Sequence, residues 1–165
     1  MSQPEVWLRG SIPGVPPLLM PAAHALAGAR EDLARVAADL SDGELWARPA
    51  GVASVGFHLR HVAGILDRLL TYARGEPLTP AQLAYLRAEG DPGASADELL
   101  RAVDEAVERA LAQIRATPDA DLLLPRGVGR LQLPSTVQGL IFHAAEHAQR
   151  HTGQVVTLSR IVRAG

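Results

Sequence analysis

The chain alternates between four long amphipathic segments and shorter polar connections. In each long segment apolar residues recur every three or four positions, which is the period of an α-helix that buries one face. We expect these helices over residues 18–40, 54–74, 95–117 and 135–162. Few segments show the strict alternation of a half-buried strand. The pattern therefore predicts an all-α protein built as a four-helix bundle, a fold whose sites are usually formed by inward side chains of facing helices.

Helix start and stop signals support these boundaries. Ser54 and Ser95 each stand where a side-chain oxygen can cap the first turn of a helix, and Gly75 stands where the second helix should stop. Residues 41–44 (SDGE) match a capping box and should open a short turn of helix. A second short helix is expected over 80–87. The bundle should therefore carry short accessory helices between its long ones.

The connections point to one domain over residues 1–165. Residues 1–17 are rich in proline and glycine and should form an irregular N-terminal arm. Residues 118–134 should form a long crossover loop before the last helix, and a short hairpin within that loop is left open.

In the first helix the positions expected to face the core are Leu18, Ala22, Leu26, Ala29, Leu33, Val36 and Leu40.

Composition narrows the classes of function. Apolar residues make up 47% and charged residues 21%, which is ordinary for a soluble globular protein. No apolar run approaches the roughly 20 residues of a membrane helix, and the start lacks a secretory signal, so we expect a cytoplasmic protein without a membrane partner. Because there is no cysteine, any metal must be held by nitrogen and oxygen. The net charge of −2, with arginines interspersed among acids, shows no basic stripe and argues against a nucleic-acid partner.

Three of the six histidines lie four residues apart near the C-terminus, at His143, His147 and His151. A step of four turns a helix by only about 40°, so neighbouring members share a face. On a helical wheel, His147 and His151 interrupt the middle of the buried stripe, whereas His143 lies on its edge. Because an unpaired buried polar group costs on the order of 1–3 kcal/mol, two core imidazoles favour metal ligation over simple packing. A catalytic ion commonly has three protein ligands and one open position, so a third ligand is expected from another helix.

The second helix offers two candidates for that ligand. His58 lies nearer the centre of the apolar stripe and His61 lies at its margin. Periodicity alone slightly prefers His58 and leaves both open.

Two runs resemble the signatures of the DinB/YfiT-like four-helix proteins. Residues 54–63 (SVGFHLRHVA) are similar to that family's second-helix signature, and residues 147–154 (HAQRHTGQ) are similar to its fourth-helix signature. The resemblance implies that His61, His147 and His151 are the metal ligands. His58 would then support a ligand, line the pocket or simply pack in the core, and His143 would be a neighbour in the pocket. Gln154 could orient a ligand through its amide and is equally consistent with a surface position.

The resemblance also implies a divalent transition metal and a small-molecule substrate. Zinc or nickel is expected, with iron or manganese as alternatives, because imidazole ligands accept several such ions. The better understood branches of the family look like thiol-dependent transferases or metal-dependent hydrolases.

Acidic residues bear on the choice between these two reactions. The helical acids Asp67, Asp104, Glu108 and Glu146 all face away from the assigned apolar faces, so no helix supplies a carboxylate beside the metal. This favours an S-transferase that activates a low-molecular-weight thiol over a hydrolase that uses water. The loops leave the hydrolase open, since they contain four further candidate acids: Glu89, Asp91, Asp119 and Asp121.

A different class of function is a metal-free binding module. Phe142 and Val156 lie outside the apolar stripe of the last helix and are candidates for the face of a homodimer.

Overall fold

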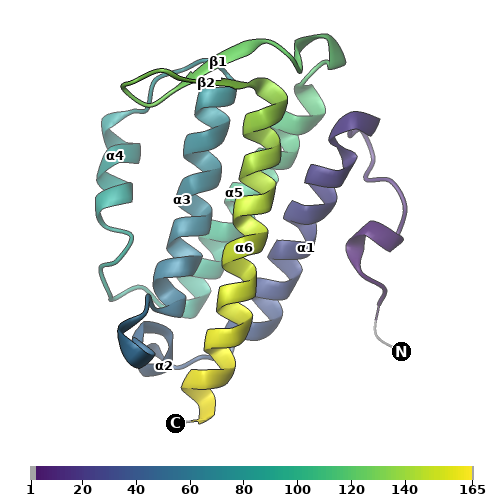
Figure 1. Cartoon of the computed structure of the whole chain (residues 1–165). Coiled ribbons are helices and arrows are strands. Elements are labelled where there is room, and N and C mark those ends of the chain that lie inside the picture. The colour runs from purple at the N-terminus through teal and green to yellow at the C-terminus, as the bar shows by residue number, and fades with distance from the viewer. Residues whose placement is uncertain (1–2, 165) are drawn as a thin grey trace.

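Four long helices form a bundle in the computed structural model, which describes residues 3–164 (Figure 1). They are α1 (Met20–Ala37), α3 (Val55–Ala73), α5 (Ala96–Ala116) and α6 (Val137–Ala164). Their apolar faces meet in one core, in which Leu26, Leu33, Leu59, Leu66 and Ile114 are fully buried. The predicted all-α four-helix fold is confirmed. No described helix has the length and apolar character needed to span a membrane.

The start of the first helix differs from the expectation. Leu18, expected to face the core, is exposed, whereas Leu19 is buried. The reason is that residues Pro17–Leu19 form a separate 3-10 turn before α1 begins, so the 3.6-residue period does not extend back to Leu18.

Local capping explains the accessory helices and the helix boundaries. The predicted capping box at Ser41 opens α2 (Asp42–Trp46), and Ser54 caps α3 through the backbone N–H of Phe57. The short helix expected over 80–87 is α4 (Pro80–Arg87), which lies along the outer side of α3 (Figure 1). Gly75 adopts a φ of +79°, the left-handed conformation that commonly stops a helix, directly after the C-cap of α3.

Residues 125–136 form the short hairpin that the sequence left open. Strands β1 (Pro125–Val128) and β2 (Leu133–Thr136) pair antiparallel, with Gly127 opposite Pro134. The hairpin crosses the end of the bundle where α3 finishes and α6 begins (Figure 1). The described part of the arm is irregular apart from 3-10 turns, and it is held against α1 by the ion pair of Arg9 with Glu31 and by a contact between Gly10 O and His24 Nε2 at 2.8 Å.

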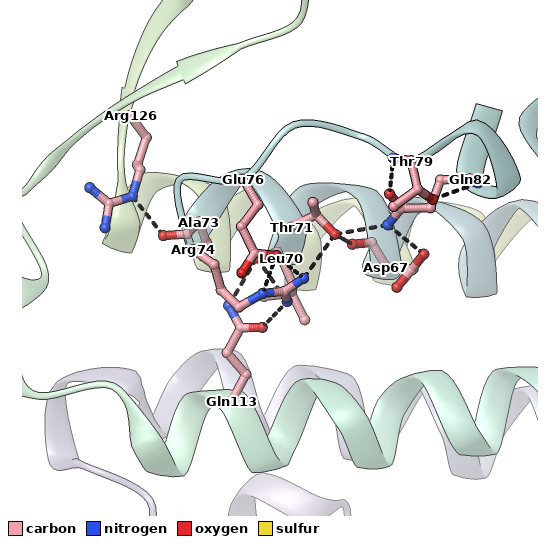
Figure 2. Close-up of polar contacts among 10 residues, drawn as sticks. All are labelled: Asp67, Leu70, Thr71, Ala73, Arg74, Glu76, Thr79, Gln82, Gln113 and Arg126. Carbon is pink, nitrogen blue, oxygen red and sulfur yellow. Dashed lines mark hydrogen bonds and ion pairs between the residues drawn. The ribbon is translucent and has the colours of Figure 1, made fainter.

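The C-terminal half of α3 is tied to three neighbouring elements (Figure 2). From α4, Gln82 Nε2 donates to Asp67 Oδ2 at 2.7 Å and to Thr71 Oγ1 at 2.8 Å. Arg74 Nη1 donates to Gln113 Oε1 of α5 at 2.6 Å. From the hairpin, Arg126 Nε donates to the carbonyl oxygen of Ala73 at 2.7 Å. These bonds fix α3 relative to α4, so residues on the α3 surface that faces α4 have a defined environment.

Candidate metal centre

Three histidines from two antiparallel helices converge where α3 and α6 pack together, and all three are partly buried. His61 comes from the second turn of α3, and His147 and His151 come from successive turns of α6. The Nε2 atom of His147 lies 3.0 Å from Nε2 of His61 and 3.1 Å from Nε2 of His151. One ligand atom from each of the three residues lies within 4.8 Å of the other two. The structure therefore brings together the three residues that the resemblance implied.

A buried carboxylate orients His61 from the side opposite to His147. Glu89 Oε2 lies 2.6 Å from His61 Nδ1, and Glu89 Oε1 accepts a hydrogen bond from Arg68 Nη1 at 2.7 Å. Because an arginine-paired carboxylate is an acceptor only, Nδ1 of His61 carries the hydrogen and donates a hydrogen bond to Glu89. The Nε2 atom of His61 is then left with its lone pair directed at His147.

His58 takes a comparable position behind His151. Its Nδ1 lies 2.8 Å from Nδ1 of His151, and its side chain is 5% exposed. When His151 Nδ1 donates this hydrogen bond, its Nε2 presents a lone pair to the site. Periodicity slightly preferred His58 as a ligand, whereas in the structure His61 approaches His147 and His58 contacts the far nitrogen of His151.

Burial lowers the pKa of three imidazoles in or beside the cluster. Burial, with a smaller contribution from His61, lowers the pKa of His58 to about 4. Burial and the neighbouring histidines lower the pKa of His151 to about 3, and the same causes lower the pKa of His147. A neutral imidazole is the form that binds a metal, so at neutral pH these residues are ready to act as ligands.

The donor set fits a divalent ion. Two ligands at 2.0–2.1 Å from a tetrahedral ion lie about 3.3 Å apart, close to the observed Nε2 separations. When His61 and His151 are protonated at Nδ1, each directs an Nε2 lone pair at His147. A single hydrogen on His147 Nε2 can form a good hydrogen bond with only one of these lone pairs, whereas a cation between the three atoms can bind both. His147 Nδ1 is buried and has no hydrogen-bond partner among the described residues.

A second group of possible ligands on α6 suits a cation less well. It consists of His143, Glu146 and His147. Arg150 Nη2 donates to both carboxylate oxygens of Glu146, and His143 Nδ1 lies 2.8 Å from Glu146 Oε1. The guanidinium occupies the carboxylate and opposes a second positive charge there. His143 is exposed, with its ring centroid 5.3 Å from that of His147.

Gln154 and the loop acids Glu89 and Asp91 differ in their exposure to solvent. Gln154 is exposed on α6, three residues beyond His151, so a part in the pocket stays a prediction. Of the loop acids, Glu89 is buried beside the histidines, while Asp91 is exposed.

Sequence reasoning named Glu89 only as one of four loop acids and did not single out Arg68. An available signal was Gly64, a glycine in the interior of a helix, which often marks the close approach of another group.

Two hollows in the described part of the protein lie apart from the histidine cluster. One of about 1060 Å³ lies between the arm and α1, and one of about 330 Å³ lies between α3, α4 and α5. Neither is lined by His61, His147 or His151, so their shape does not define a substrate at the cluster.

Comparison with known proteins agrees with the fold. Residues 25–155 match the family model described as the DinB superfamily. The chain belongs to the DinB superfamily. The bundle of this DinB protein is also similar to a crystal structure described as that of the conserved protein of locus from Enterococcus faecalis, with a TM-score of 0.75 and 19% sequence identity over 89% of this chain and 98% of that one. No curated protein matches the sequence.

Proposed function

We propose that this DinB protein is a metal-dependent enzyme that holds one divalent transition metal on His61, His147 and His151. The observation that carries the proposal is the approach of three Nε2 atoms while Nδ1 of His61 and of His151 contacts other residues. An ion bound by three neutral imidazoles with an open position supplies Lewis acidity that favours a thiolate or hydroxide near neutral pH. Zinc or nickel is the expected ion, with iron or manganese as alternatives.

We further propose that the reaction is the transfer of a low-molecular-weight thiol to an electrophile. The carboxylate nearest the cluster, Glu89, has both oxygens engaged by His61 and Arg68 and is 3% exposed. It is therefore poorly placed to take a proton from water, as a hydrolase requires. The protein has no cysteine, so the thiol must come from the substrate.

A metal-dependent hydrolase is the second candidate, and the pair of His143 and Glu146 favours it. Glu146 orients His143 through Nδ1, which leaves Nε2 of His143 for a hydrogen bond with water or substrate. Activity against esters or amides that His143→Gln abolishes, without loss of bound metal, would support the hydrolase over the transferase.

The metal proposal is tested by elemental analysis of the purified protein before and after demetallation and reloading. We expect close to one equivalent of a transition metal and its recovery on reloading. His151→Ala should lose most of the bound metal. His24→Ala, which alters a histidine of α1 that contacts the arm, should retain the metal. A comparison of His61→Ala with His58→Ala tests which histidine of α3 is the ligand. His61→Ala should lose more of the bound metal than His58→Ala. The proposal would be contradicted if the purified parent protein held no transition metal and the demetallated protein took none up.

The reaction is tested by screening metal-loaded protein against pairs of small thiols and electrophiles. The matched controls are demetallated protein and His151→Ala, which should both be inactive. A thiol adduct that forms equally fast with either control would contradict the transferase.

We also propose that the protein is a cytoplasmic homodimer. Phe142 on α6 is 65% exposed, which leaves a large apolar side chain for an interface. Val156, the other residue expected on that face, is instead half-buried and packs against the core, so it is not free to join the interface.

A further inference from the structure

Glu89 is a buried charge that lies outside the apolar core. It follows α4 in a loop, yet it is 3% exposed, and its partner Arg68 on α3 is 5% exposed. Taking a carboxylate and a guanidinium out of water is costly, and such a pair often adds little stability compared with apolar residues of similar size. The two oxygens of Glu89 point to different groups, Oε1 to Arg68 and Oε2 to His61. The pair therefore calls for a role beyond holding the loop.

Helix α3 is shaped to receive this carboxylate. His61, Gly64 and Arg68 follow one another at spacings of three and four residues, so they lie along one side of the helix. A Cβ atom at Gly64 would lie 2.6 Å from Glu89 Oε1 and 2.7 Å from Arg68 Nη1. Any other residue at position 64 would have to displace the ion pair. The glycine thus admits Glu89 to the helix surface at the level of His61.

The backbone of the loop is held by separate contacts. Arg60 Nη1 donates to the carbonyl oxygens of Ala88 at 2.7 Å and Asp91 at 2.5 Å, on either side of Glu89. Trp46 Nε1 donates to the carbonyl oxygen of Ala94 at 2.9 Å. Because these contacts do not use the Glu89 side chain, the loop should keep its course when that side chain is replaced.

We propose that Glu89 is a positioning residue of the metal centre, set in place by Arg68 and Gly64. By accepting a hydrogen bond from Nδ1–H of His61, it fixes the tautomer whose Nε2 lone pair faces His147, and it holds the ring in that orientation. A carboxylate in this position also makes the imidazole a stronger donor to a metal. The inference rests on the proposed metal site, because it assigns Glu89 an effect on metal affinity.

The test measures the affinity of the full chain for Zn²⁺ by competition with a chromophoric chelator. Glu89→Gln keeps the size of the side chain and removes its charge, and it should weaken binding by about 10- to 100-fold. The matched control Asp91→Asn changes an exposed carboxylate of the same loop and should bind Zn²⁺ as the parent does. Equal affinity of Glu89→Gln and the parent would overturn the proposal.

A second matched pair uses the glycines. Gly64→Ala should weaken Zn²⁺ binding because it displaces the Glu89–Arg68 pair, whereas Gly90→Ala, whose Cβ would meet nothing within 4 Å, should leave it unchanged. Gly64→Ala with the affinity of the parent would count against the proposed placement of the pair.

Nitrogen-15 NMR of the imidazoles separates this proposal from the metal site itself. In metal-free protein His61 should be protonated at Nδ1, and Glu89→Gln should reduce the share of that tautomer. If the parent binds no metal but shows this change, the metal site fails while the positioning contact stands. If His61 has the same tautomer in both proteins, the positioning role fails whether or not metal binds.

Discussion

The metal-free protein should lose stability as the pH falls from 6.5 toward 5, because its buried histidines resist protonation. In the folded state the pKa of His58 is about 4 and that of His151 is about 3, mainly through burial. In the unfolded chain both pKa values return to about 6.5. Below pH 6.5 the unfolded state therefore binds protons that the folded state does not, and by linkage the equilibrium moves toward unfolding. At pH 7.5, well above 6.5, both states are almost entirely neutral at these residues, so their full contribution to stability is present there.

The size of the effect follows from the two pKa values. For a group with a folded pKa of about 4 and an unfolded pKa of about 6.5, lowering the pH from 7.5 to 5 costs about 2 kcal/mol of the free energy of unfolding. His151 adds a similar amount, which sets an upper value of about 4 kcal/mol for the pair. Because His151 is partly exposed and shares one hydrogen bond with His58, water and coupling reduce this value, and we expect about 2–4 kcal/mol.

Urea unfolding of demetallated protein at pH 7.5, 6.5, 5.8 and 5.0 measures this change. Carboxylates, with ordinary pKa values of about 4, stay mostly ionised over that range, so the histidines dominate the slope. The double variant His58→Gln/His151→Gln should show a much shallower dependence, each protein being compared with its own value at pH 7.5. His24→Gln leaves the cluster intact and should keep the slope of the parent. Parallel curves for the parent and the double variant would refute the reasoning.

Three further predictions concern packing, capping and assembly. Gly56→Ala should destabilise the protein by about 1–3 kcal/mol in urea unfolding, because the added Cβ would lie 2.9 Å from the ring of Trp46. The control Gly153→Ala, whose Cβ would meet nothing within 4 Å, should be neutral or stabilising. Equal stabilities of the two variants would contradict the packing at Trp46. Ser95→Ala should cost about 1 kcal/mol by the same measurement, since it removes the N-cap of α5, and Ser95→Thr should restore most of the loss. Phe142→Gln should convert a homodimer to monomer in sedimentation, and a monomeric parent would contradict the proposed interface.

The helices could be predicted because their signals are local. Ser41 with Glu44, Ser54 and Ser95 cap the helices that they were expected to cap, since each side chain bonds to a backbone N–H only three residues away. The misplaced position Leu18 shows the limit of a periodic pattern. Periodicity says which residues share a face but not at which residue the helical geometry begins.

The site was predicted in part for the same reason. His147 and His151 face one direction because a four-residue step on one helix does so in any context. The choice between His58 and His61 depends instead on how α3 is rotated against α6: the wheel slightly preferred His58, whereas the family resemblance implied His61. In the structure the Nε2 atom of His61 meets that of His147, and His58 lies against the other side of His151.

The sequence by itself determined the helices, the paired histidines of α6 and the exclusion of thiolate ligands. Periodicity left the choice between His58 and His61 open, the family resemblance implied His61, and the tertiary structure brings His61 to the histidines of α6 and decides which acid joins it. Glu89 is separated from His61 by 28 residues and lies outside any helix, so no period relates the two. Their contact exists because Arg60 holds the loop backbone and Gly64 leaves room beside α3. Such close approach between distant segments depends on how the elements pack, which a local pattern of residues does not encode.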